Sequence, residues 1–222
     1  MTENIEKYYK NLYTEEKEKF NANGHKFEYL YNGRVKLVKE MISVIPVQEN
    51  VVLDAGCGNG NFFDSAIRPN IKIKKCDAMD LLEDATRLVS NKYDEVYCGS
   101  TVQLSSFFKN KYSIVNSMEI FSYIKPEERQ SFFKEHISIL DKNGFFILTV
   151  TNLESIYRKI IKPEAELFPY YFNNKIIIDH MKVFKDVELV EYKGIDIFNI
   201  VHNVSSYNSF FLYELSFLFK KL

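Results

Sequence analysis

A short apolar run that leads into alternating glycines constrains the fold of this chain more than any other feature. Residues 51–53 are apolar, as in a buried strand, Asp54 follows them, and a helical pattern begins soon after the turn. The glycines are Gly56, Gly58 and Gly60. Glycine permits positive φ angles and leaves room where a Cβ would hold a ligand away. A strand that runs through such a turn into a helix therefore predicts a crevice in which backbone N–H groups meet a ligand.

Residues 53–60, Leu-Asp-Ala-Gly-Cys-Gly-Asn-Gly, resemble the first motif of the class I (Rossmann-like) methyltransferases that depend on S-adenosyl-L-methionine (SAM). The nearest alternative is the dinucleotide fingerprint G-x-G-x-x-G, but here the third glycine is Gly60, and Asn61 stands where that pattern requires glycine. The spacing favours SAM over NAD. The resemblance implies a SAM-dependent methyltransferase, with SAM as its cofactor and a doubly wound α/β fold.

Strands and helices alternate along the rest of the chain, which predicts βαβ units and a mostly parallel sheet that is covered on both faces. We expect strands at 51–54, 71–76, 95–98, 112–116, 145–150 and 187–192. We expect helices at 26–45, 61–67, 81–91, 126–140, 174–184 (with Asn174 as N-cap) and 207–222. The resemblance also implies a seventh, antiparallel strand. Residues 196–201 could supply that strand as a hairpin partner, or it is missing.

The length of 222 residues fits one methyltransferase domain, 1–222. Within it we expect N-terminal helices at 1–45, a SAM-binding core at 46–192 and a C-terminal segment at 193–222. By resemblance, the N-terminal helices form a lid over SAM. The C-terminal segment contains the apolar stretch 210–219, which is too short to span a membrane. We expect it to pack as a helix on the sheet edge, and the alternatives are a homodimer contact or a peripheral membrane foot.

The balance of charge and the use of cysteine narrow the partners and the compartment. A formal net charge of −1 argues against a nucleic acid held mainly through its phosphates. The three cysteines, Cys57, Cys76 and Cys98, lack metal-binding spacing, so we expect no metal and reduced thiols in a cytoplasmic protein. The N-terminus lacks an apolar stretch of signal-peptide type, and no run of the sequence is long enough to be a transmembrane segment.

The resemblance assigns the first part of the SAM site. Asp54 is expected beneath the amino-acid moiety of SAM, where it holds the ammonium group, and the glycines Gly56, Gly58 and Gly60 let the backbone approach that moiety. Asp77 is expected to close the second strand and to accept hydrogen bonds from both ribose hydroxyls. Asp80 is the alternative if that strand ends later.

The resemblance also assigns the far end of the cofactor. Ser100 and Thr101 follow the third strand, where the family usually has an acid that reads the adenine amino group, and an ordinary turn is the alternative. Ser117 and Met118 follow the fourth strand and are expected near the sulfonium. The same segment ends in Tyr123, where the family often has histidine.

The residues do not mark one general base. The catalytic candidates are Tyr13 in the N-terminal helices, Asn152 after the fifth strand, and His180, and structural roles for them stay open. Arg34 is a candidate partner for the carboxylate of SAM.

The acceptor is inferred by resemblance alone. A compact chain with an N-terminal lid and no added recognition domain resembles bacterial enzymes that methylate an O or N atom of small molecules such as sugars, sugar nucleotides or other metabolites. One alternative is an enzyme that acts on protein or tRNA. Another is a non-catalytic SAM-binding protein, which the departures at Ser100 and Tyr123 keep open.

Overall fold

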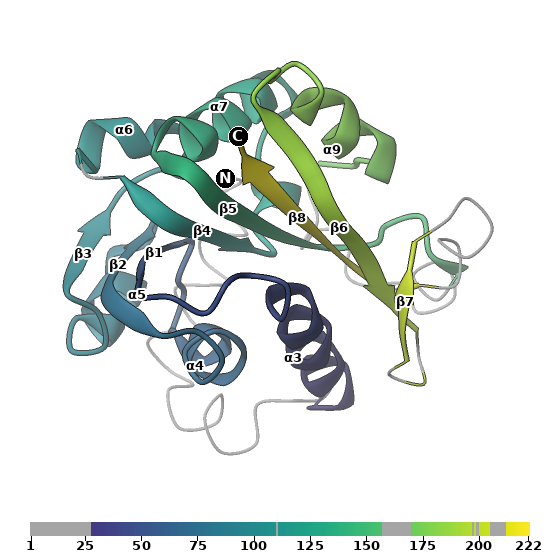
Figure 1. Cartoon of the computed structure of the whole chain (residues 1–222), viewed down its shortest axis with the longest axis horizontal. Coiled ribbons are helices and arrows are strands. Elements are labelled where there is room, and N and C mark those ends of the chain that lie inside the picture. Colours follow the sequence, from purple (N-terminus) through teal and green to yellow (C-terminus); the bar gives the residue numbers. More distant parts are fainter. Residues whose placement is uncertain (1–27, 110, 157–169, 197, 199, 205–211) are drawn as a thin grey trace.

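The computed structural model describes residues 28–109, 111–156, 170–196, 198, 200–204 and 212–222. These residues form one eight-stranded sheet with helices on both faces (Figure 1). The strands are β1 (Asn50–Ala55), β2 (Ile73–Asp80), β3 (Glu95–Cys98), β4 (Tyr112–Met118), β5 (Leu140–Thr151), β6 (Val187–Ile195), β7 (Val201–Asn203) and β8 (Glu214–Lys221). Their order across the sheet is β3-β2-β1-β4-β5-β8-β6-β7.

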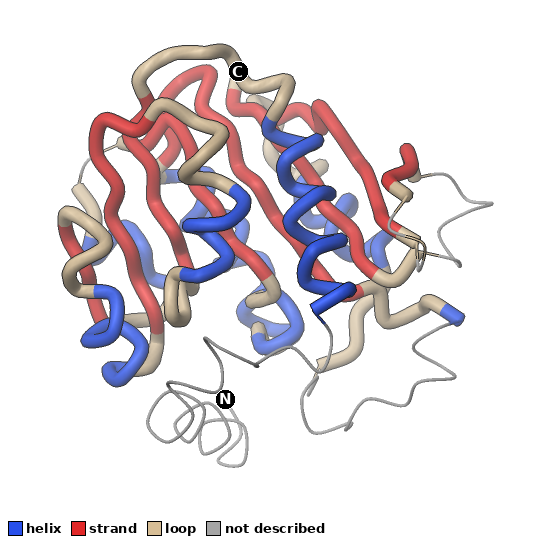
Figure 2. The backbone as a smooth tube through the Cα atoms, turned by 90° about the horizontal axis from the view of Figure 1, so that it is seen from below, coloured by secondary structure: helices blue, strands red, loops and turns tan. Residues whose placement is uncertain are grey.

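Two layers of helices cover this sheet. One face carries α3 (Glu28–Ile42), α4 (Asn61–Ala66) and α5 (Glu83–Val89), and the other carries α6 (Leu104–Phe107), α7 (Arg129–Ser138) and α9 (Asn174–Met181). Short 3-10 turns lie at η1 (Thr101–Gln103), η2 (Phe121–Tyr123) and η3 (Pro126–Glu128). Figure 2 views the sheet from the side of α3 and α4, which lie in front of the strands.

The predicted doubly wound α/β class is confirmed. Strands β1 to β5 are parallel to one another, and the strand order reverses between β1 and β4. In open sheets of this kind, ligands bind in the crevice beyond the carboxyl ends of the strands at that reversal. The glycine turn follows β1 and therefore lies at this crevice.

The prediction of a terminal helix over 207–222 is wrong. Residues Glu214–Lys221 form β8, which inserts between β5 and β6 and runs antiparallel to both. This strand is the seventh, antiparallel strand, for which the sequence left two possibilities open: that residues 196–201 supply it or that it is missing. A short apolar run can be a buried helix or a strand covered on both faces, so periodicity could not separate the two. Because residues 215–219 are buried in the sheet, they cannot serve as the proposed homodimer or membrane contact.

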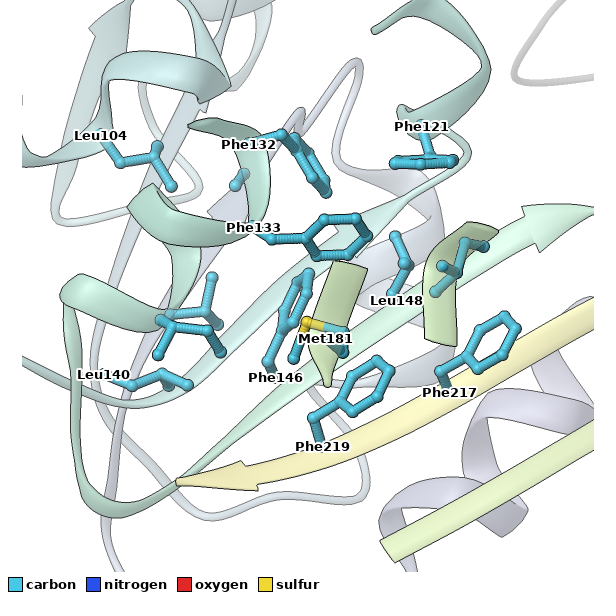
Figure 3. Packing of buried hydrophobic residues seen from close by; sticks show 14 of the residues in the cluster. Leu104, Phe121, Phe132, Phe133, Leu140, Phe146, Leu148, Met181, Phe217 and Phe219 are labelled. Carbon is cyan, nitrogen blue, oxygen red and sulfur yellow. The ribbon is translucent and has the colours of Figure 1, made fainter. Parts of the chain in front are cut away.

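Aromatic side chains fill the layer between the sheet and α7 and α9. Figure 3 shows Phe132 and Phe133 of α7 above Phe146 of β5, with Phe219 of β8 beside them. Phe133 and Phe146 have ring centroids 6.5 Å apart, and Phe146 and Phe219 are stacked at 6.1 Å. The alternation of β8 explains this, since Leu215, Phe217 and Phe219 face this layer while Leu218 faces α3.

Smaller boundaries also differ from the expectations. The N-cap of α9 is Asn173, whose Oδ1 accepts a hydrogen bond from Ile176 N at 3.0 Å, and not Asn174. The hairpin partner of β6 is Val201–Asn203. The expected helices before residue 28, and with them most of the proposed lid, lie outside the described residues. Within the part of the chain that the structure describes, no helix is long and apolar enough to cross a membrane.

The place of β8 predicts which aromatic residues stabilise the fold. Phe217 is fully buried and stacks on Tyr192 with ring centroids 4.4 Å apart, so Phe217→Ala should lower the free energy of unfolding by about 3–5 kcal/mol. The control is Phe198→Ala, since Phe198 is 70% exposed. Urea denaturation followed by circular dichroism measures both. Equal effects of the two substitutions would contradict the buried strand.

Candidate functional site

The turn after β1 is built from three glycines in the left-handed region. Gly56, Gly58 and Gly60 have φ angles of 89°, 52° and 74°. The carbonyl oxygen of Met79 in β2 accepts hydrogen bonds from both Gly56 N at 2.7 Å and Cys57 N at 3.0 Å. Because residues other than glycine are strained at such φ values, the turn requires the glycines that the sequence supplies.

Asp80 is the acid that stands beside this turn. It is the last residue of β2, its Oδ2 accepts a hydrogen bond from Gly58 N at 2.9 Å, and its Oδ1 accepts one from Leu82 N at 3.0 Å. Burial raises the pKa of the Asp80 carboxyl, while its backbone hydrogen bonds lower it. The carboxylate therefore meets the glycine turn at the carboxyl end of β2.

The expectation that Asp77 closes the second strand is wrong. Asp77 lies inside β2 and is fully buried, where its Oδ2 accepts a hydrogen bond from Tyr112 OH at 2.7 Å and lies 3.0 Å from Lys75 Nζ. The alternating pattern of the sequence ends at Cys76 because the last five residues of β2 are buried, whichever way their side chains point. The acid at the end of β2 is therefore the alternative, Asp80.

Asp54 is held in a buried hydrogen-bonded group beneath the turn. Its Oδ2 accepts from Tyr93 OH at 2.7 Å, and its Oδ1 accepts from Asn116 Nδ2 at 2.8 Å. Burial raises the pKa of the Asp54 carboxyl to about 6, although both hydrogen bonds lower it. The contacts of Asp54 with Tyr93 and Asn116 were not predicted from the sequence, and the only signal was the asparagine that follows the apolar residues 114–115 in β4.

Ser100 and Thr101 follow β3, as expected. Ser100 caps η1, since its Oγ accepts a hydrogen bond from Val102 N at 3.4 Å, and Thr101 is buried. The carbonyl oxygen of Asp80 accepts a hydrogen bond from Gly99 N at 2.9 Å. The loops after β1, β2 and β3 are therefore linked by backbone hydrogen bonds at one edge.

The end of β4 closes against the glycine turn. Ser117 is fully buried, and Met118 packs against the cluster under α3. A Cβ built on Gly56 would lie only 2.4 Å from the side chain of Ile120, so this close approach also requires glycine. Glu119, between Met118 and Ile120, has a φ angle of 58°, which is uncommon for a residue with a side chain.

The guanidinium of Arg34 contacts two carboxyl groups of the protein itself, those of Glu214 and Glu119. Its Nε lies 2.8 Å from Glu214 Oε1 and its Nη2 donates to Glu214 Oε2 at 3.1 Å, while Nη2 lies 3.8 Å from Glu119 Oε2. Glu119 Oε2 also accepts hydrogen bonds from Thr151 N at 3.1 Å and Thr151 Oγ1 at 2.6 Å. Neither Glu119 nor Glu214 was predicted from the sequence as part of the site.

The two catalytic candidates that the structure describes, Asn152 and His180, both contact other parts of the protein. Asn152 is fully buried, donates to Leu212 O at 2.7 Å and accepts from Glu154 N at 3.2 Å. His180 lies on α9, stacked on Phe133 and 2.8 Å from Gln130 Oε1, in the layer with α7. Tyr13 lies outside the described residues.

In the part of the chain that the structure describes, no group of three or more His, Cys, Asp or Glu side chains is arranged to hold a metal ion. Cys57 and Cys76 are buried free thiols, and Cys98 is an exposed one.

The residues at this edge fit SAM. The three left-handed glycines leave room for an amino-acid tail close to the main chain, and a carboxylate at the end of β2 suits a pair of ribose hydroxyls. Gly58 N donates a hydrogen bond to the Asp80 carboxylate, so the glycine turn and the acid lie side by side.

Comparison with known proteins agrees with this geometry. Residues 52–144 match the family model described as a methyltransferase domain. A search of curated proteins finds no match.

Solved structures share the fold at low sequence identity. A SAM-dependent methyltransferase of Thermotoga maritima, described as a possible histamine N-methyltransferase, superposes with a TM-score of 0.69 at 16% identity and covers 98% of this chain and 99% of its own. The N-methyltransferase NodS of Bradyrhizobium japonicum, in complex with S-adenosyl-L-homocysteine (SAH), gives 0.67 at 12% and covers 99% of each chain. Magnesium protoporphyrin IX methyltransferase of Synechocystis, with bound SAM, gives 0.63 at 12% and covers 100% of this chain and 99% of its own.

The raised pKa of Asp54 predicts a pH dependence of stability. The pKa of the folded state, about 6, lies above the ordinary aspartate value of 3.8, so the folded protein holds this proton more tightly than the unfolded chain. The stability that protonated Asp54 contributes is therefore lost as the pH rises from about 4 to about 6, by on the order of 3 kcal/mol. Asp54→Asn should remove this loss.

Urea denaturation of both proteins across this pH range measures the difference between their free energies of unfolding. That difference should change between pH 4 and 6 and stay constant above. Parallel pH profiles would contradict the raised pKa.

Proposed function

We propose that this chain, a class I SAM-dependent methyltransferase, transfers the methyl group of SAM to an O or N atom of a small-molecule acceptor such as a sugar, a sugar nucleotide or another metabolite. The observation that carries the proposal is the hydrogen bond between Asp80 and Gly58, which joins a ribose-binding acid to a left-handed glycine turn. The free thiol of exposed Cys98 supports a reducing, cytoplasmic location.

In this proposal the cofactor is held by three loops at the carboxyl edge. Gly56, Gly58 and Gly60 present main chain to the amino-acid tail, above Asp54. Asp80 accepts the ribose hydroxyls in place of Asp77. Ser100 and Thr101 border the adenine, and Ser117 and Met118 border the sulfonium at the end of β4.

When bound, SAM supplies an electrophilic methyl group on a sulfonium. The task of the protein is to hold the acceptor atom in line with that methyl group and to exclude water, and such positioning is worth ~7–11 kcal/mol. Ile120, which lies against Gly56, and the end of β5 border the space where the acceptor must enter.

Charge at this edge supports a small acceptor over tRNA. Among the described residues that border it, the carboxylates of Asp80 and Glu119 outnumber the guanidinium of Arg34, and this excess of negative charge disfavours a polyanion. The similar structures described as a possible histamine N-methyltransferase and as a magnesium protoporphyrin IX methyltransferase act, by those descriptions, on small molecules. A protein or tRNA acceptor and a non-catalytic SAM-binding protein are the alternatives.

The two acids of β2 provide a matched test of the cofactor site. Asp80→Asn should weaken SAH binding by ~1.5–3 kcal/mol, because a charged hydrogen-bond partner is lost. Asp77→Asn removes the same charge in the same strand but should leave SAH affinity unchanged, since Asp77 faces Tyr112 and Lys75. Isothermal titration calorimetry measures both. Weaker binding only in Asp77→Asn would overturn this placement of the ribose.

The class of acceptor can be tested by separating cell material into metabolites, tRNA and protein. The enzyme with SAM should release SAH, measured by mass spectrometry, when the metabolite fraction is present. Asp80→Asn serves as the weakened control. Release only with tRNA or protein would support the first alternative, and release with none would support the second.

A further inference from the structure

The side chain of Lys92, in the connection between α5 and β3, reaches the end of the glycine turn. We propose that Lys92 is a positioning residue of the cofactor site: it holds the turn at Asn59 and Gly60 in the shape that receives the amino-acid tail of SAM. The inference rests on the proposed function and adds a residue that acts on the cofactor through the main chain of the turn.

The ammonium group of Lys92 joins the two residues that flank the last glycine of the turn. Its Nζ donates to Asn59 O at 3.1 Å and to Asn61 Oδ1 at 3.3 Å. It also donates to Asp64 Oδ2 in α4 at 2.8 Å. Because Asn59 precedes Gly60 and Asn61 follows it, these contacts restrain the turn on both sides of the glycine.

The aliphatic part of Lys92 packs on the same glycine. A Cβ built on Gly60 would lie 3.2 Å from Lys92 Cδ and 3.4 Å from Lys92 Nζ. A side chain at this position would therefore crowd Lys92, in addition to being strained at the φ angle of 74°. The turn and the lysine fit each other closely, which is what a positioning contact requires.

Two charged residues at α4 hold Lys92 itself in place. Asp64 Oδ2 accepts from Lys92 Nζ, and Asp64 Oδ1 accepts from Arg68 Nε at 2.9 Å. Arg68 Nη2 also donates to the carbonyl oxygen of Lys92 at 2.9 Å. Both the main chain and the side chain of Lys92 are thus fixed before any ligand arrives, and a site that is ordered in advance binds at a lower entropic cost.

The next residue along the chain holds the beginning of the turn. Tyr93 OH donates to Asp54 Oδ2 at 2.7 Å, and a Cβ built on Gly60 would lie 3.3 Å from the same hydroxyl. The Tyr93 ring lies against Phe63 of α4, with ring centroids 5.6 Å apart. One short segment, Lys92 and Tyr93, therefore contacts the acid at the end of β1 and the glycine that precedes α4.

A second lysine of equal exposure provides a matched comparison. The side chain of Lys92 is 31% exposed and that of Lys75 is 30% exposed. Lys75 forms ion pairs with Asp77 and Glu95, in β2 and β3, at 3.0 and 2.9 Å. Loss of either lysine removes one charge and its ion pairs, but only Lys92 contacts the glycine turn.

Three variants separate positioning of the turn from a general effect of a lost ion pair. Lys92→Met loses the ammonium group, so the Kd of SAH should rise about 10-fold, as for a lost hydrogen bond to a charged group. Lys92→Arg keeps a charged donor and should restore most of the affinity. Lys75→Met is the matched control and should leave the Kd unchanged. Isothermal titration calorimetry measures all three.

Hydrogen exchange of the ligand-free proteins reports on the turn directly. Gly60 N donates to Cys57 O at 2.9 Å, and Asn61 N donates to Asn59 Oδ1 at 3.1 Å. Lys92→Met should speed the exchange of these two amides and leave the amides of β5 and β8 unchanged. A role in overall stability alone would speed exchange in the central strands as well.

Unchanged SAH affinity in Lys92→Met, an equal loss in Lys92→Arg or in Lys75→Met, unchanged exchange at the turn, or faster exchange in β5 and β8 would each overturn the proposal. Failure of the wild-type protein to bind SAH would instead reject the proposed function.

Discussion

The carbonyl oxygen of Met79 is the acceptor on which the glycine turn depends. It receives the N–H groups of both Gly56 and Cys57, and the next residue, Asp80, receives that of Gly58. The carbonyl of Asp80 in turn receives Gly99 N after β3. The candidate site is therefore a continuation of the hydrogen bonding of the sheet, which fixes the distance between the main chain at the turn and the carboxylate beside it.

The sequence was sufficient to predict the features that depend on short segments of the chain. Left-handed turns leave a direct trace as glycines, and the order of strands and helices predicts a doubly wound sheet. The length of β2 had no such trace, because its last residues are buried on both faces and do not alternate, so the acid at the end of this strand is Asp80 and not Asp77. The apolar run that forms β8 was ambiguous for the same reason.

The rest of the site could not be predicted because it depends on pairings between distant segments. Arg34 and Glu214 are separated by 180 positions, and they meet only because β8 inserts beside β5 and brings Glu214 opposite Thr151. Asp54 and Tyr93 likewise come together only once α5 packs on the sheet. Polar side chains that are brought together by tertiary contacts leave no periodic pattern in the sequence. The contacts among Arg34, Glu119 and Glu214 therefore could not be predicted from it.

The insertion of β8 also has a consequence for biosynthesis. Both neighbours of this strand, β5 and β6, are made before it, and they pair with it and not with each other. A ribosome-bound chain that ends before residue 214 therefore lacks the strand that pairs with the facing edges of β5 and β6, and unpaired strand edges are sites of misassociation. Closure of the middle of the sheet is thus a late event, and it completes the surroundings of Glu119 at the same moment.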